Sequence, residues 1–170
     1  MTSFDRYAEM NITLRPIIES DLPIFYQHQQ HKPAQLLAAF VHEDPSDRVA
    51  FDTHWAKLMK SDKILKRSIE VDAQLVGHIM SFDIPNEHDS FDREITYWID
   101  HHHWNKGIAS KALELFLTTE TTRPLFGRAA KDNIASIRSM EKCGFVLIAE
   151  ERGFANARGE EIDEVVMRLT

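Results

Sequence analysis

The segment from Asp100 to Ser110 has the residue types of an anion-binding site. It reads Asp-His-His-His-Trp-Asn-Lys-Gly-Ile-Ala-Ser and leads from a strand-like stretch into a helical one. The start of a helix leaves several N–H groups unpaired and carries positive dipole charge, and a glycine without Cβ lets a phosphate approach that backbone closely. Lys106 adds a formal charge beside Gly107. The pattern indicates a phosphate site, and its plainer alternative is a helix with a glycine near its start.

Two common nucleotide-binding patterns do not occur in the chain. Neither the Gly-x4-Gly-Lys-Ser/Thr spacing of a P-loop nor the Gly-x-Gly-x-x-Gly spacing of dinucleotide-binding folds is found. ATP and NAD are therefore disfavoured as the phosphate-bearing ligand.

A second segment further along the chain completes a recognisable pair of motifs. It begins Asn133-x-x-Ser136 and continues as Glu-Lys-x-Gly-Phe at 141–145. Together with Tyr-Trp-Ile at 97–99 and Asn-Lys-Gly-Ile-Ala at 105–109, it resembles the GNAT superfamily of acetyl-CoA-dependent N-acetyltransferases. The particular likeness is to the branch of the ribosomal-protein alanine acetyltransferases, and it covers essentially the whole chain.

This resemblance implies that acetyl-CoA binds as co-substrate. By the likeness, the loop amides hold the pyrophosphate, the end of the preceding strand receives the pantetheine arm and the thioester carbonyl, and Asn133 binds a pantetheine amide. The residues so assigned to CoA are Trp98, Ile99, Asp100, Trp104, Asn105, Lys106, Gly107, Ile108, Ala109, Ser110, Asn133 and Ser136. Trp104 departs from the family pattern, which has Gln or Arg there.

The expected reaction needs a proton for the departing thiolate and a base for the amine. By the resemblance, Met140 stands where many family members have a tyrosine that protonates the thiolate, and a methionine cannot do this. Ser136 lies one helical turn away and carries a hydroxyl, so we expect it to be the acid. Glu94, on the strand leading to the thioester site, is the candidate base, with a solvated carboxylate as its alternative interpretation.

Two other features are interpreted as ordinary. Adjacent side chains of an extended segment point to opposite faces, so His101, His102 and His103 are poorly arranged to bind one ion, and we expect no metal. Cys143 is the single cysteine and lacks a local partner, so we expect a small packed residue rather than a nucleophile.

The elements that must position these residues are those of an α/β protein with a mixed sheet. Hydrophobic patterns predict strands at 12–17, 64–71, 75–82, 93–99, 125–130, 145–148 and 164–169. Helices are expected after Ser20, within 27–60, after Gly107 and after Asn133, and Gly153 and Gly159 are expected to turn the chain between the last two strands.

The resemblance adds an arrangement to these elements. It implies a twisted sheet of six or seven strands flanked by helices, with a V-shaped opening between strands 93–99 and 125–130. The segment 27–60, interrupted by Pro33 and Pro45, is expected to be mobile and to face the substrate.

Composition limits the remaining choices. The 170 residues are 43% apolar and 28% charged, which predicts one acetyltransferase domain over residues 1–170. A net charge of -7 argues against a nucleic-acid partner. The longest apolar run, residues 36–41, is too short to span a membrane, and residues 1–11 lack the apolar stretch of a signal peptide. With a lone cysteine, these observations predict a cytoplasmic location.

Three functions compete at this point. The first two are acetyl transfer to the α-amine of a protein and acetyl transfer to a small-molecule amine, and the third is a CoA-binding regulatory module without turnover, suggested by Met140. A homodimer is left open as a further partner. The loops at 27–45 and 151–160 should decide the acceptor, and their sequence does not identify it.

Overall fold

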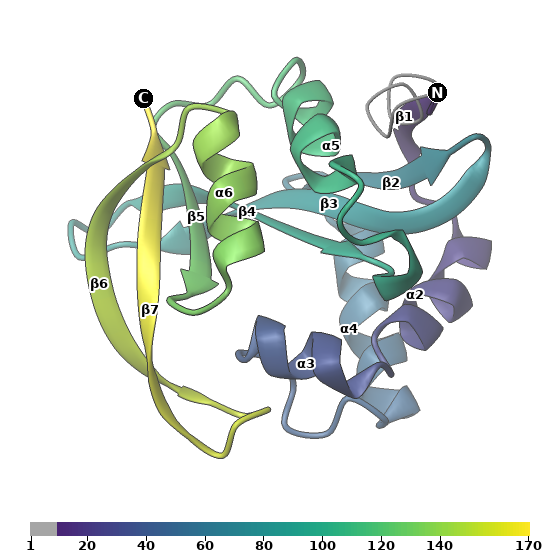
Figure 1. Ribbon diagram of the computed structural model, residues 1–170, viewed down its shortest axis with the longest axis horizontal. Helices are drawn as coiled ribbons and strands as arrows, with labels where there is room; N and C mark the ends of the chain where they lie inside the picture. Colours follow the sequence, from purple (N-terminus) through teal and green to yellow (C-terminus); the bar gives the residue numbers. More distant parts are fainter. Residues whose placement is uncertain (1–9) are drawn as a thin grey trace.

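The computed structural model describes residues 10–170 (Figure 1). Residues 1–9, which include most of the stretch expected to lack a signal peptide, lie outside the described part. The elements are β1 (Ile12–Pro16), η1 (Glu19–Asp21), α2 (Leu22–His28), α3 (Lys32–Ala38), α4 (Arg48–Lys60), β2 (Leu65–Val71), β3 (Gln74–Pro85), β4 (Phe91–Ile99), η2 (His101–His103), α5 (Ile108–Phe116), β5 (Leu125–Ala130), α6 (Ile134–Lys142), β6 (Val146–Ala155) and β7 (Glu160–Leu169).

The strands form one seven-stranded sheet in the order β1-β2-β3-β4-β5-β7-β6. Every neighbouring pair is antiparallel except β4 and β5, which are parallel. The β4–β5 ladder covers only three residue pairs and ends at Ile95 and Gly127, after which the two strands diverge (Figure 1). The predicted mixed sheet with its V-shaped opening is therefore confirmed.

Helices cover both faces of this sheet. On one face, α5 packs against α6 and β1, over a core that includes Ile79, Leu113 and Phe116. On the other face, α2 and α4 pack together over a second core that includes Phe25 and Trp55. The alternating side chains of β3 and β4 thus meet different helices on the two faces; the middle of β3 is buried and most of β4 is half-buried.

The last hairpin differs from the expectation. The strands predicted at 145–148 and 164–169 extend into a ladder of β6 and β7, closed at Ala155 and Glu160. Gly153 is a strand residue facing the ring of Phe40, so its predicted place in a turn is wrong, whereas Gly159 does lie in the turn with a positive φ of 65°. Most of β6 is exposed on both faces, so it has no hydrophobic alternation from which its length could be predicted.

Within residues 10–170, no helix has the length and apolar content that crossing a membrane requires.

Candidate active site

A cavity of about 450 Å³ lies between β4, the loop that follows it, and α6. Eleven of the twelve residues assigned to CoA line it, and Asp100 is the exception: Trp98, Ile99, Trp104, Asn105, Lys106, Gly107, Ile108, Ala109, Ser110, Asn133 and Ser136. Ala34, Leu37 and Ala38 of α3 form part of its wall. The structure thus brings the two sequence motifs to one cavity.

The start of α5 forms one end of this cavity. Gly107 precedes the helix with a φ of 73°, and an added Cβ would meet no protein atom within 4 Å. The first helical hydrogen bond runs from Lys111 N to Gly107 O, and no side chain of the described chain caps the helix. The N–H groups of Ile108, Ala109 and Ser110 are therefore available to an anion. Gly107 is required for its positive φ as well as for the space in front of it.

Two cations that the sequence analysis missed line the same cavity. Arg138 and Lys142 are four residues apart on α6, and neither has an ion-pair or hydrogen-bond partner among residues 10–170. With Lys106 they give the cavity three positive charges. Their i, i+4 spacing on a predicted helix was the signal available in the sequence.

Asn133 and Trp104 already have partners of their own. The amide oxygen of Asn133 caps α6 by accepting from Ser136 N at 3.3 Å, and its Nδ2 donates to Leu37 O at 3.4 Å. The indole Nε1 of Trp104 donates to Ile99 O at 2.9 Å. These contacts tie α3 and the loop to the cavity walls, so both residues shape the cavity whether or not they also touch CoA.

Ser136 is paired with a tyrosine from β4. The Tyr97 hydroxyl lies 2.9 Å from Ser136 Oγ and 3.3 Å from Ser136 O. Burial raises the pKa of Tyr97, which keeps its hydroxyl protonated. Tyr97 follows Ile95 by two residues on β4, so alternation puts both on one face of the strand. Its contact with α6 could not be read from the sequence. Met140, which stands where the resemblance expects a tyrosine, is buried. Its Sδ would lie 2.5 Å from a Cβ added at Gly127.

A second cavity, of about 1,070 Å³, opens on the α2 and α4 side of β4. It is lined by Glu94, Arg128 and Glu164 among others, together with His54 and Leu58 of α4. Arg128 Nε lies 3.3 Å from Glu94 Oε2, and its Nη1 lies 2.9 Å from Glu164 Oε1.

Glu94 is not a solvated surface carboxylate, because its side chain is only 13% exposed. Its pKa is raised, chiefly by burial, with the charges of Glu164 and Glu151 adding to the shift and Arg128 opposing it. The three carboxylates outnumber the one guanidinium of Arg128, so this group carries net negative charge and favours a cationic ligand.

The two cavities share a wall at the opening between β4 and β5. Ala38, Tyr97, Trp98, Asn133 and Ser136 line both of them. A ligand in the first cavity can therefore meet a ligand from the second at this wall, beside the Tyr97–Ser136 pair.

Comparison with known proteins fits this arrangement. Residues 11–146 match the family described as the acetyltransferase (GNAT) domain, and the chain belongs to this family. It is an acetyl-CoA-dependent N-acetyltransferase, as the sequence motifs predicted. No curated protein is similar enough in sequence to match the chain.

Several solved structures share the fold. RimJ from Mycobacterium smegmatis, in complex with CoA-disulfide, aligns with a TM-score of 0.74 at 19% identity over 94% of this chain and 81% of that one. The ribosomal-protein-alanine N-acetyltransferase from Brucella melitensis gives 0.76 at 20% identity over 92% and 98%. The spermidine N-acetyltransferase from Vibrio cholerae, in complex with CoA and spermine, gives 0.73 at 19% identity over 92% and 95%. At these identities the likeness supports the fold.

Proposed function

We propose that the chain transfers the acetyl group by direct attack of a primary amine on acetyl-CoA in a ternary complex. The observation that carries this proposal is the wall shared by the two cavities, because it lets an amine and a thioester meet without a covalent enzyme intermediate. Ordering two reactants in this way can supply about 7 to 11 kcal/mol of the barrier reduction.

In the proposed complex, CoA occupies the first cavity. Its phosphates are held by the amides at the start of α5 and by the charges of Lys106, Arg138 and Lys142, and its acetyl thioester lies at the shared wall. The pyrophosphate and the three cations have opposite charges, and hydrogen bonds to a charged oxygen contribute about 1.5 to 3 kcal/mol each.

The amine enters from the second cavity. Glu94 accepts a proton from it, the neutral nitrogen attacks the thioester carbonyl carbon, and the resulting tetrahedral intermediate expels the CoA thiolate. Ser136 Oγ donates a proton to that sulfur, and the protonated Tyr97 beside it donates to Ser136 in turn. The nitrogen of the tetrahedral intermediate releases its second proton, which replaces the one that the Tyr97–Ser136 pair gave to the sulfur. The products are an amide and free CoA thiol, and the proton taken by Glu94 leaves to solvent.

The acceptor is proposed to be a cationic amine, either the α-amine of a protein or a small molecule. Net negative charge around Arg128 supports an amine over an anionic acceptor. The Tyr97–Ser136 pair also weakens the reason for a regulatory module without turnover, because a hydroxyl donor is present although Met140 is not a tyrosine. We place the activity in the cytoplasm, on the strength of the lone Cys143.

A kinetic experiment tests this proposal. Free thiol is followed while acetyl-CoA and an amine from a panel of peptides and small amines are varied together. A ternary complex gives intersecting double-reciprocal lines, and Cys143→Ala should behave as the wild type does. Parallel lines, or loss of turnover in Cys143→Ala with the fold intact, would indicate an acetyl-enzyme instead. Absence of thiol release with every amine, despite CoA binding, would favour the regulatory module.

A further inference from the structure

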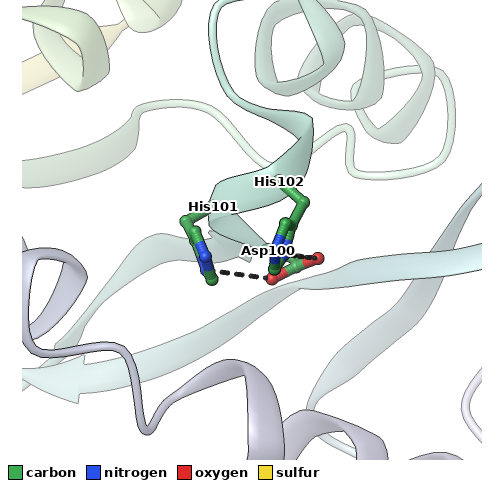
Figure 2. Close-up of side chains that lie close together, drawn as sticks. All are labelled: Asp100, His101 and His102. Carbon is green, nitrogen blue, oxygen red and sulfur yellow. Dashed lines mark ion pairs between the residues drawn. The ribbon is translucent and has the colours of Figure 1, made fainter.

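The short turn that follows β4 brings together side chains of the types that bind transition metals. His101, His102 and His103 form a 3-10 turn, η2, directly after Asp100. The expectation that these histidines are extended and point to opposite faces is therefore wrong. One ligand atom each from Asp100, His101 and His102 lies within 4.8 Å of the other two. Figure 2 shows both rings directed toward the carboxylate at the end of β4.

The separations between these atoms suit a metal better than direct hydrogen bonds. The Nδ1 atom of His101 lies 3.3 Å from Oδ1 of Asp100, and the Nδ1 atoms of His102 and His103 lie 3.5 and 3.4 Å from its Oδ2. Hydrogen bonds from N–H to oxygen are usually about 2.7 to 3.2 Å long. Two ligands bound tetrahedrally at zinc distances of about 2.0 to 2.1 Å lie about 3.3 to 3.4 Å apart.

The buried nitrogens of the turn lack other partners. Nδ1 of His101 and Nδ1 of His103 are both buried and make no hydrogen bond within residues 10–170. His31 stacks on His101 with ring centroids 3.6 Å apart, and its own Nδ1 accepts from Ala34 N at 3.3 Å. The nitrogens of His101 and His103 are thus positioned by the fold and left without a donor or acceptor.

The charge of Asp100 is also unbalanced. Its side chain is only 14% exposed, and no lysine or arginine in the described chain pairs with it. One divalent ion bound between this carboxylate and the neighbouring rings would balance the charge.

We infer that Asp100, His101 and His102 form a binding site for one divalent transition-metal ion. A set of imidazoles and one carboxylate favours Zn²⁺ among such ions. His102 is 72% exposed, which leaves an entry path for the ion. None of these three residues lines the CoA cavity, although the next residue, His103, does.

Zn²⁺ titration of the chelator-treated, untagged chain tests this inference by calorimetry and by thermal unfolding. The wild type should bind one equivalent. At a free Zn²⁺ concentration of about 100 times Kd, its unfolding midpoint should rise by about 5 to 10 °C, and EDTA should reverse the rise. Asp100→Asn and His102→Gln should each weaken binding by at least about tenfold.

Two further variants make the experiment decisive. His102 is exposed, so His102→Gln keeps the test available if Asp100→Asn fails to fold. His88→Gln is the matched control, because His88 is another exposed histidine beside a carboxylate, with Nε2 3.6 Å from Glu87. It should bind Zn²⁺ as the wild type does. Equal binding by wild type, Asp100→Asn and His102→Gln, or no stoichiometric binding by the wild type, would overturn the inference.

Discussion

His78 makes the stability of this protein depend on pH in a way that can be measured. It lies on β3 with its ring packed against those of Phe25 and Trp55, and neither ring nitrogen has a hydrogen-bond partner in the described chain. Burial lowers the pKa of His78 to about 3, and the nearby His28 and His54 add to the shift. The folded protein therefore holds His78 neutral, while the unfolded chain binds a proton below pH 6.5.

The sign and size of the effect follow from this difference. Because the folded pKa is depressed, the unfolded state binds more protons as the pH falls from 6.5 toward 3, and stability is lost over that range. Between pH 7 and pH 5 the loss from this one group amounts to about 2 kcal/mol. His78→Leu removes the titrating group and keeps an apolar side chain in the same space. The variant should therefore lose about 2 kcal/mol less than the wild type on acidification.

Urea unfolding at pH 7 and pH 5, followed by tryptophan fluorescence, measures the two losses. The quantity compared is the change in unfolding free energy between the two pH values, so any packing cost of the substitution cancels. His88→Gln, which alters an exposed histidine, should keep the wild-type dependence. If His78→Leu and the wild type lose equal stability, the pKa of His78 is not depressed by burial and the reasoning is refuted.

The remaining predictions concern turnover and CoA binding. Ser136→Ala should lower the acetyl-transfer rate constant by about 10- to 10³-fold and leave acetyl-CoA affinity unchanged. Tyr97→Phe should also lower this rate constant. Full turnover in Ser136→Ala would leave water as the proton source. Glu94→Gln should lower the acetyl-transfer rate by about 100-fold, and the loss should be largest at low pH, where the amine is protonated. A variant that reacts as fast as the wild type at every pH would contradict the role of Glu94 as base. Gly107→Ala should weaken CoA binding by about tenfold or more in calorimetry, the worth of one hydrogen bond to a charged oxygen. Gly159→Ala is the control, because Gly159 has a similar positive φ of 65°. It should change stability by a similar amount and leave CoA affinity unchanged.

The sequence predicted the elements around the CoA cavity well because their signals are local. A glycine before a helix, an asparagine at the next helix start and the alternation of β4 each depend on a few neighbouring residues. The opening between β4 and β5 came from the resemblance, since no hydrophobic pattern encodes where a parallel ladder ends.

The features that were missed depend on contacts between distant segments. Tyr97 and Ser136 are 39 residues apart, and only the fold brings their hydroxyls together. Likewise, the histidines after Asp100 look unsuited to share a ligand until the chain is seen to turn there. The larger tyrosine side chain that many family members have at the position of Met140 has little room here, because Met140 is buried against Gly127.

The two halves of the cleft are built from the chain in different ways. The CoA cavity is lined mainly by a nearly continuous stretch between β4 and α6, with part of α3 added. The chain around the end of α3 is tied to the tip of the last hairpin, where Arg158 Nε donates to Leu36 O at 2.9 Å and Asn156 Nδ2 donates to Val41 O at 2.8 Å. These pairs span 122 and 115 residues of sequence. Because Ala38, Phe40 and Val41 line the second cavity, these hydrogen bonds make the wall of the proposed acceptor site depend on the last hairpin. Replacing only one of these two segments with the loop of another acetyltransferase would therefore remove the hydrogen bonds that hold the other segment in place.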